Sequence, residues 1–430
     1  MRAITTPIWH PCSQMKDYEN FKPLHVIRAA GSYIELANGQ KIIDAISSWW
    51  CKSLGHQHPR LKQVLLKQLD HFEHIILANS TNAVIEELSE RLTQLLPSLK
   101  KVFYAGDGSC AVEIAMKMSL HARQITGETQ RTKFITLKNA YHGETVGAMS
   151  VSDIGMYRKP YESMLFASEV LTAIPYVNDV SDALWLDCES VWAATEKQLA
   201  KVSNTATAII LEPILQGAGG MKIYSQDFLR RLRRFATTHG VHIIADEIMT
   251  GIGRTGKMLA CAHADIEPDF LCLGKGLTSG WFPFSAVLAT NAIYDYFYND
   301  YETGNSFLHS HTFSGHVLGA SVALEVLKII AEENMIAKAN QLGTTLLKNM
   351  RAIAAITQKL TNIRSIGAVV AADLLPDAKQ PRLAYDVFQK AVQLGAWLRP
   401  LGNTIYWLPP LNMDIMTANS LKDITQAALA

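Results

Sequence analysis

The stretch "IIADEIMTGIGRTG", residues 243–256, joins an apolar run to two carboxylates and a G-x-G-x-x-G pattern. The apolar run predicts a buried strand, and the glycine spacing is that of a dinucleotide-binding turn. In a dinucleotide fold, however, the glycine turn follows the strand directly and leads into a helix that holds the pyrophosphate. Asp246 and Glu247 instead stand at the strand end, where their charges would repel a pyrophosphate. The stretch therefore predicts a strand that delivers carboxylates to a site, with glycines that let the chain turn away.

The residues beyond the glycines also argue against a dinucleotide. The segment that follows them is short and contains Pro268, so it is a poor candidate for a long crossover helix. The next apolar run begins at Asp269 and ends at Lys275, whereas ribose binding needs an acid at the strand end. We therefore exclude a nicotinamide or flavin enzyme of that fold.

Apolar runs of the same kind recur between residues 55 and 320. They are "TAIILEP" (207–213), "VHIIADE" (241–247), "DFLCLGK" (269–275) and "FSAVLAT" (284–290). Such runs are typical of strands buried on both faces, as in a parallel sheet covered by helices. Between them, "SQDFLRRLRRFATTHG" (225–240) has the Ser start, apolar spacing and Gly stop of a helix. We predict an α/β fold whose large domain, residues 55–320, holds a mainly parallel sheet.

The two ends of the chain have a different pattern. After about residue 316 the sequence predicts one or two long helices, then short strands and helices up to a last helix from about Thr417. Near the start, "GSYIELANGQKIIDA" predicts a strand–turn–strand unit with Asn38-Gly39 at the turn. We assign residues 1–54 and 321–430 to one smaller α+β domain.

The composition narrows the class of protein. The 430 residues are 48% hydrophobic and 18% charged, and 40 basic against 39 acidic residues give a net charge of +1, so a general nucleic-acid binder is not expected. No apolar run reaches the roughly 18 residues of a membrane span, and the first residues lack a signal-peptide core. We expect a cytoplasmic protein without a membrane partner. The six cysteines form no CxxC pair and the histidines no HExxH motif, so reduced thiols and no metal site are expected.

The ends of the predicted strands carry Glu212, Asp246 and Lys275. Ligands of open α/β sheets collect at such ends. These residues could form a plain ion-pair cluster. Alternatively, a lysine in an apolar setting can form a Schiff base with the aldehyde of pyridoxal phosphate, which also needs a carboxylate against its pyridine nitrogen. Asp246 can supply that carboxylate.

A phosphate site is predicted at "YAGDGSCAVEIAMKMSLHAR", residues 104–123. Gly106, Gly108 and Ser109 would let backbone N–H groups converge on an anion at the start of a helix. The alternative is an ordinary helix start with Ser109 as its N-cap. Tyr141, in the polar loop "NAYHGET", is a candidate to stack on the cofactor ring.

These motifs resemble a known family. "LEPILQGAGG", "IIADEIMTGIGRTG" and "LCLGKGLTSGWFPFSAVLAT" are similar to the class III (ω-amino) aminotransferases, pyridoxal-phosphate enzymes of the aspartate-aminotransferase fold, over about residues 8–412. The resemblance implies a reaction of two half-transaminations with ping-pong kinetics. It also implies roles for Lys275 as the Schiff-base lysine, Asp246 as the pyridinium partner, Gly108 and Ser109 at the phosphate, and Tyr141 on the ring.

Further motifs resemble the subgroup that converts 8-amino-7-oxononanoate to 7,8-diaminononanoate in biotin synthesis. These motifs include "IWHPCSQM", "DAISSWW", "YHGETVGAMSVSD", "FLHSHTFSGH" and "LRPLGNTIYWLPP". The tandem Trp49-Trp50 discriminates most, because other ω-aminotransferases usually carry smaller residues there. The resemblance implies a homodimer in which His311 and Thr312 reach the neighbouring subunit's cofactor, with substrate contacts from Trp49, Trp50, Ser310, Arg399 and Tyr406.

Two departures from the family pattern stand out, and the first of them leaves the amino donor open. Cys12 stands where tyrosine is common, and His311 stands where proline is common. The amino donor is expected to be S-adenosyl-L-methionine, with lysine as the alternative. A general ω-amino acid or diamine aminotransferase is the nearest rival. An aminomutase or decarboxylase of the same fold, and a non-catalytic cofactor-binding protein, are the others.

Overall fold

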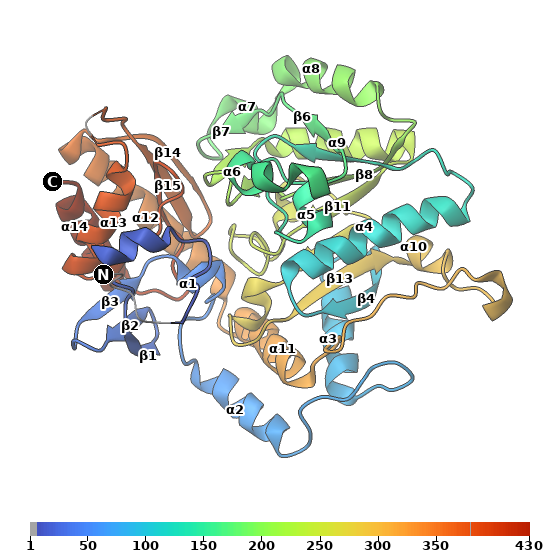
Figure 1. Cartoon of the computed structure of the whole chain (residues 1–430), viewed down its shortest axis with the longest axis horizontal. Helices are drawn as coiled ribbons and strands as arrows, with labels where there is room; N and C mark the ends of the chain where they lie inside the picture. Colours follow the sequence, from blue (N-terminus) through green and yellow to red (C-terminus); the bar gives the residue numbers. More distant parts are fainter. Residues whose placement is uncertain (1–6, 379) are drawn as a thin grey trace.

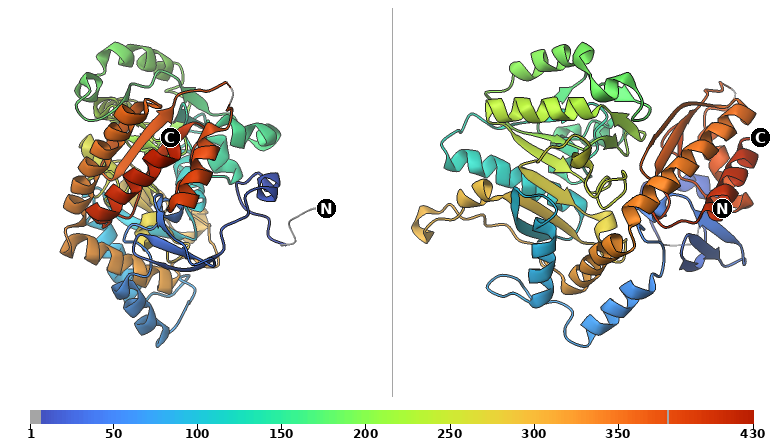
Figure 2. Two further views of the ribbon diagram at one scale, coloured as in Figure 1. Left: turned by 90° about the vertical axis from the view of Figure 1, so that its left-hand side faces the viewer. Right: turned by 180° about the vertical axis from the view of Figure 1, so that it is seen from behind.

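The computed structural model describes residues 7–378 and 380–430, so residues 1–6 and 379 of the predicted small domain lie outside it. One part of the molecule is built on a seven-stranded sheet, and the other combines the N-terminal strands with the C-terminal helices (Figure 1). Figure 2 shows the same two parts from the side and from behind. The arrangement agrees with the α/β class expected from the sequence, while the exact domain boundaries stay a prediction.

The central sheet has the strand order β4-β13-β12-β11-β8-β5-β6. Its members are β4 (Leu99–Ala105), β5 (Lys133–Leu137), β6 (Glu169–Leu171), β8 (Ala206–Leu211), β11 (His242–Asp246), β12 (Phe270–Leu273) and β13 (Ser285–Thr290). The strands from β12 to β6 pair in parallel, which confirms a mainly parallel sheet.

Strand β13 corrects one expectation. The run "FSAVLAT" was grouped with the parallel strands, but β13 pairs antiparallel with both β12 and β4. The connection over residues 274–284 contains only the 3₁₀ turn η4 (Lys275–Thr278). A parallel crossover needs a dozen or more residues, usually with a helix, so this short link can only return the chain in the opposite direction.

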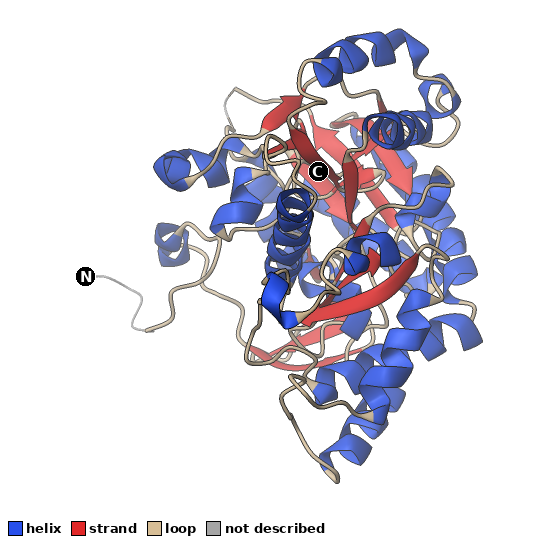
Figure 3. Cartoon of the chain, turned by 90° about the vertical axis from the view of Figure 1, so that its right-hand side faces the viewer, coloured by secondary structure: helices blue, strands red, loops and turns tan. Residues whose placement is uncertain are grey.

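Alternate residues of the sheet face two different layers of helices, which surround the strands in Figure 3. Ala208 and Ile210 belong to the buried cluster under α4 (Gly108–Ile125). Ile209 and Leu211 belong to the cluster that contains the apolar side of α9 (Gln226–His239). The apolar runs thus reflect burial on both faces, as expected.

The predicted helix over residues 225–240 is confirmed in detail. The Ser225 side chain accepts hydrogen bonds from the backbone N–H groups of Asp227 and Phe228, and Gly240 ends the helix with φ 62°. The remaining helices of this part are α2 (Pro59–Leu69), α3 (Ala83–Thr93), α5 (Val146–Ser150), α6 (Gly155–Arg158), α7 (Ala183–Leu186), α8 (Glu189–Ala200), α10 (Asn291–Asp295) and α11 (Val317–Glu332). A small sheet of β7 (Tyr176–Val177), β10 (Lys222–Tyr224) and β9 (Leu215–Gln216) lies beside it.

Two small sheets, the short helical turn α1 (Ser47–Trp50) and three longer helices form most of the rest. The first sheet contains β1 (Val26–Ala30), β2 (Tyr33–Leu36), β3 (Lys41–Asp44) and β16 (Ala396–Trp397), and the second contains β14 (Leu360–Ile366), β15 (Val369–Leu374) and β17 (Thr404–Trp407). The helices are α12 (Met335–Thr357), α13 (Leu383–Leu394) and α14 (Ile415–Leu429). The expected hairpin is β2–β3, where Gly39 has φ 84°. The long helical stretch is two helices, α11 and α12.

Within residues 7–378 and 380–430, no helix is both long and apolar enough to span a bilayer. The same residues contain no group of three His, Cys, Asp or Glu side chains that could hold a metal ion.

Candidate active site

The carboxyl ends of three neighbouring parallel strands meet at one edge of the central sheet. Glu212 follows β8, Asp246 ends β11, and Lys275 lies just beyond β12. A cavity of about 670 Å³ opens at this edge, and all three side chains line it. Among the ion pairs of the described residues, Asp246 is paired with His142 and Lys275 has no carboxylate partner. The structure therefore brings Glu212, Asp246 and Lys275 together, but they do not form the ion-pair cluster that the sequence left open as the alternative.

Burial sets the chemistry of Lys275. Burial lowers the pKa of its amine, while the nearby charges of Asp246 and Glu212 act in the opposite direction. The Lys275 Nζ lies 4.9 Å from the ring centroid of Trp50, and the backbone is held at φ 40°. A lysine with a lowered pKa has a larger neutral fraction near pH 7, which suits a nucleophile or a general base.

The Asp246 carboxylate is fixed by two contacts. Its Oδ2 lies 2.8 Å from His142 Nδ1, and its Oδ1 accepts a hydrogen bond from the backbone N–H of Ile248 at 3.1 Å. His142 is buried, and its Nε2 has no partner among the described residues. Sequence reasoning missed His142, whose only signal was its place next to Tyr141. The pair holds a carboxylate in one orientation at the cavity floor.

Glu212 links two loops below the cavity. Its Oε1 accepts from the backbone N–H of Tyr141 at 3.0 Å, and its Oε2 accepts from the N–H of Gly217 at 2.9 Å. Burial raises the pKa of Glu212 to about 7, with His142 lowering it and the charge of Asp246 raising it further. Glu212 therefore positions the loop that carries Tyr141.

The start of α4 forms a narrow cradle. Asp107, not Ser109, caps this helix, because its side chain accepts from the backbone N–H of Cys110 at 3.0 Å. The alternative of Ser109 as N-cap is therefore wrong. The Ser109 hydroxyl instead accepts from the backbone N–H of Glu144 at 3.4 Å, and Ser109 lines the cavity. A Cβ on Gly108 would lie 2.9 Å from Ile248 Cδ1, and a Cβ on Gly143 would lie 2.1 Å from Ser109 Oγ. Side chains larger than hydrogen would fill this space at a helix N-terminus suited to an anion.

These features fit pyridoxal phosphate. An anion cradle, a fixed carboxylate, a lysine of lowered pKa and an aromatic ring converge on one cavity. The aromatic ring is that of Tyr141, whose hydroxyl donates to Glu144 Oε1 at 3.0 Å and whose side chain lines the cavity. The donor set contains no residue that conflicts with a phosphorylated pyridine aldehyde.

Comparison with known proteins decides the family. The family model "Aminotransferase class-III" matches residues 14–429. The chain is a class III aminotransferase. A relative from Helicobacter pylori named "Adenosylmethionine-8-amino-7-oxononanoate aminotransferase" is 41% identical over 94% of this chain and 91% of its own length. A relative of the same name from Synechococcus elongatus is 35% identical over 98% of this chain and 97% of its own length.

Solved structures agree with this assignment. The adenosylmethionine-8-amino-7-oxononanoate aminotransferase of Methanocaldococcus jannaschii has a TM-score of 0.90 and 32% identity, covering 98% of this chain and 96% of that one. An amine transaminase from an uncultivated Pseudomonas species, solved in its PLP-bound form, has a TM-score of 0.91 and 29% identity over 99% of both chains. The protein is thus a pyridoxal-phosphate-dependent transaminase.

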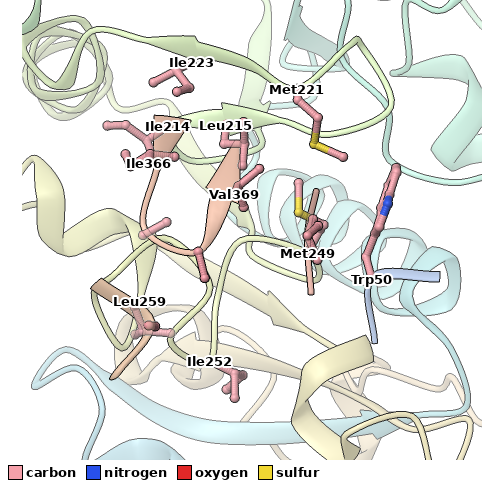
Figure 4. Packing of buried hydrophobic residues seen from close by; sticks show 14 of the residues in the cluster. Trp50, Ile214, Leu215, Met221, Ile223, Met249, Ile252, Leu259, Ile366 and Val369 are labelled. Atoms are coloured by element: carbon pink, nitrogen blue, oxygen red, sulfur yellow. The ribbon is translucent and has the colours of Figure 1, made fainter. Parts of the chain in front are cut away.

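The tandem tryptophans form one wall of the aminotransferase cavity. Trp50 is buried, and its Nε1 donates to the Tyr406 hydroxyl at 2.9 Å. Trp49 is 42% exposed, and the Arg399 guanidinium carbon lies 4.0 Å from its ring centroid. Figure 4 shows Trp50 at the edge of a buried apolar cluster, beside Met221 and Met249. Tyr406 supports Trp50 from behind and does not itself line the cavity, so its predicted substrate contact stays a prediction.

The cavity mouth of the aminotransferase contains the first departure noted in the sequence. Cys12 lines the cavity, and its Sγ lies 3.4 Å from the Tyr157 hydroxyl. The Tyr157 ring in turn meets that of Tyr141 edge-on at 6.1 Å. Tyr157, which sequence reasoning did not single out, therefore lies next to Cys12, the position at which related enzymes commonly have tyrosine.

Ser310, His311 and Thr312 lie outside the cavity of their own chain. Ser310 and Thr312 are exposed, and the Thr312 carbonyl accepts from His74 at 2.8 Å. His311 Nε2 lies 3.1 Å from His309 Nε2. The structure thus does not bring these three residues to the site of the same chain, and their predicted roles stay predictions.

Arg254 and the glycines around it have structural roles in the aminotransferase. Arg254 is buried, and its Nη1 donates to the carbonyls of Ala368 at 3.2 Å and Pro409 at 2.7 Å. Burial lowers its pKa to about 9. Gly253 and Gly256 have φ of 86° and 84°, which glycine adopts without strain. The glycine pattern turns the chain, as the sequence indicated.

Proposed function

We propose that this class III aminotransferase transfers an amino group to the ketone of 8-amino-7-oxononanoate and forms 7,8-diaminononanoate, with S-adenosyl-L-methionine as donor. The observation that carries the proposal is the wall of Trp49 and Trp50 with Arg399 stacked on Trp49. A broad apolar wall that ends in a guanidinium suits a long aliphatic chain that ends in a carboxylate. The names of the relatives support the same substrate.

The residues divide the work of the transfer. Bound pyridoxal phosphate supplies an aldehyde carbon that carries the amino group and a ring that withdraws electrons from it. The backbone N–H groups of Gly108 and Ser109 and the Ser109 hydroxyl would hold its phosphate at the N-terminus of α4. The Asp246 carboxylate, held by His142, would stabilise the protonated, positively charged form of the pyridine nitrogen.

Lys275 is the proton carrier. Its amine has a lowered pKa and lies at the cavity floor, where it can take the proton from the amine-bearing carbon of the donor and return one to the acceptor. The donor leaves as a ketone before the acceptor enters, so the kinetics are ping-pong. Arg399 binds the acceptor's carboxylate and fixes which end of the chain enters first.

The protein acts as a homodimer with shared sites in this proposal. Support comes from the segment that carries Ser310 and Thr312, where Leu308 is 91% and Phe313 58% exposed. Large apolar side chains at that exposure suit burial against a second copy. His311 and Thr312 would then reach the partner's cofactor phosphate.

The test is a steady-state assay of the purified protein loaded with pyridoxal phosphate. The acceptor 8-amino-7-oxononanoate is combined in turn with S-adenosyl-L-methionine, lysine and a simple diamine, and 7,8-diaminononanoate is measured by mass spectrometry. Turnover with the first donor at least ten times that with the others supports the proposal. Higher turnover with lysine than with S-adenosyl-L-methionine would identify lysine as the donor and leave the proposed acceptor unchanged. Turnover of diamines with keto acids other than this acceptor supports the general ω-aminotransferase instead.

A further inference from the structure

The tandem tryptophans stand on a turn with an unusual backbone. Ser47, Ser48 and Trp50 have φ of 52°, 60° and 65°, the left-handed region that residues other than glycine rarely adopt. Three such residues within four positions persist only where the surroundings fix them. Something outside the turn must therefore hold it.

Asp44, at the end of β3, accepts hydrogen bonds from Ile46 and Ser48 of this turn. Its side chain is fully buried, and its two oxygens lie 2.9 and 2.7 Å from the backbone N of Ser48. It also accepts from the Ser48 hydroxyl at 3.1 Å and from the backbone N–H of Ile46 at 3.3 Å. His56 Nε2 lies 2.9 Å from Asp44 Oδ2. One buried carboxylate thus gathers donors from both sides of the strained residues.

Other contacts join the turn to its surroundings at its margins. The Ser47 hydroxyl donates to the carbonyl of Leu408 at 2.8 Å, and Lys52 Nζ donates to the carbonyl of Gly280 at 2.9 Å. These bonds connect the turn to the segment just after β17 and to the loop after Lys275. They do not involve the backbone N–H of Ser48. Among the described residues, only Asp44 accepts a hydrogen bond from that N–H group.

The turn sets the direction of the cavity wall. Trp50 leaves it toward Lys275 and Tyr406, and Trp49 leaves it beneath Arg399. The space for Trp50 is narrow, because a Cβ on Gly217 would come within 3.3 Å of its ring. A small change in the backbone at Ser48 would therefore move both indoles and, through Trp49, the guanidinium of Arg399.

We propose that Asp44, oriented by His56, is a positioning residue for substrate binding. Asp44 does not line the cavity. It acts by holding the turn that orients Trp49 and Trp50 and, through Trp49, Arg399. The inference rests on the proposed function only in assuming that the tryptophan wall faces the substrate. The residues that would hold the cofactor, Gly108, Ser109, Asp246 and Lys275, lie on other segments. The turn meets them through the Trp50 ring, 4.9 Å from Lys275 Nζ.

The first test replaces the carboxylate in the cofactor-loaded protein. Asp44→Asn keeps the shape but turns one oxygen into an N–H group that faces other donors, so Ser48 or His56 loses its acceptor. We expect KM for 8-amino-7-oxononanoate to rise about tenfold, kcat to change less than about threefold, and cofactor stoichiometry to stay the same. Deuterium uptake of the peptide over residues 46–52, measured without substrate, should become faster.

Two further variants separate positioning from loss of stability. His56→Gln keeps an N–H donor for Asp44, so KM and the rate of deuterium uptake over residues 46–52 should stay at the wild-type level. His56→Ala removes the donor, so both KM and the uptake rate should rise, but less than in Asp44→Asn. The matched control is Asp227→Asn, which removes another buried carboxylate that accepts from a backbone N–H, that of Cys188 at 3.1 Å, far along the chain. It should lower the melting temperature without changing KM.

The outcomes are distinct. If Asp44→Asn leaves KM and exchange at the level of Asp227→Asn, or if His56→Gln behaves as His56→Ala, the positioning role is wrong. If Asp44→Asn does not fold, the two His56 variants decide by the same readouts. If the wild-type protein does not convert the oxononanoate, the proposed function fails, and the exchange over residues 46–52 still decides the role of Asp44.

Discussion

The floor of the cavity and the segment around Thr312, both assigned to one site in the proposed homodimer, differ in how their own chain holds them. The floor lies at the ends of buried parallel strands, where Glu212 and Asp246 are each 5% exposed and hydrogen-bonded. The segment instead lies on the surface, where Tyr301 is 92% and Leu308 91% exposed. The floor is complete within one chain, whereas the segment presents apolar side chains with nothing of its own chain to bury them. The floor is determined by sheet topology, whereas the role proposed for the segment requires assembly with a second copy.

The largest effect is expected at the floor. Lys275→Ala removes the amine to which the proposed function assigns the proton transfer, so turnover should fall by more than about a thousandfold. Lys257→Ala is the matched control, because Lys257 is exposed and does not line the cavity. Borohydride reduction followed by mass spectrometry should label the wild type and the control at Lys275 but leave Lys275→Ala unlabelled. Residual turnover above 1% of wild type would contradict the role.

A charge on the exposed segment should produce the next largest effect. Leu308→Glu costs little in an isolated chain, because the side chain is 91% exposed there. If the segment packs against a second copy, the buried charge should shift the protein toward monomers at micromolar concentration and lower activity at least tenfold. Sedimentation velocity measures the shift, and Leu186→Glu, at a residue 69% exposed on α7, is the control. An unchanged oligomer would show that the segment is free surface.

The cofactor phosphate offers a direct comparison between the two regions. Ser109→Ala on the floor and Thr312→Ala on the segment should each weaken pyridoxal phosphate binding about tenfold, since each removes a hydrogen bond to a charged group. Mixing Lys275→Ala with Thr312→Ala subunits should restore tight binding in half of the sites of mixed dimers, because one site then has both native residues. Fluorescence titration of cofactor-free protein measures the affinity. If the Thr312→Ala protein binds as tightly as wild type, the segment does not reach the phosphate.

The smallest effect concerns the pH dependence of stability. Folding raises the pKa of Glu212 from 4.5 to about 7, so its contribution is fully present below pH 4.5 and is lost as pH rises through 7. Glu212→Gln does not titrate. The melting temperature of cofactor-free wild type should therefore fall relative to Glu212→Gln between pH 4.5 and 8, on the order of a few degrees. Parallel curves for the two proteins would show that Glu212 has an ordinary pKa.

The sequence predicted the floor well because its rules are local. An apolar run marks a buried strand, parallel strands end at one edge of the sheet, and Asp246 and Lys275 were found in this way. The direction of β13 was missed, because an apolar run does not encode whether a strand is parallel. Only the short link after Lys275 contained that information.

Other parts of the site depend on contacts between distant segments. His142 was missed because its partner Asp246 lies 104 positions along the chain, and a lone histidine in a polar loop gives no signal. Asp44 was missed because it acts by holding a left-handed backbone conformation at positions 47–50. The residue types at those positions do not predict that conformation. The segment of Ser310 and Thr312 was interpreted only through resemblance, and one chain cannot place it.

The reversed strand β13 has a consequence for how the enzyme can be altered. Ser285 pairs with Ala105 at the end of β4, and its hydroxyl donates to the carbonyl of Asp107, so the loop that starts at Lys275 ends beside the phosphate cradle. Residues 280–284 line the cavity along the way. In the proposed function this loop thus fixes the distance between the Lys275 amine and the cofactor phosphate, and each inserted residue would change the spacing that the cofactor has to bridge. At the opposite end of β13, after Thr290, the chain can lengthen without changing that distance.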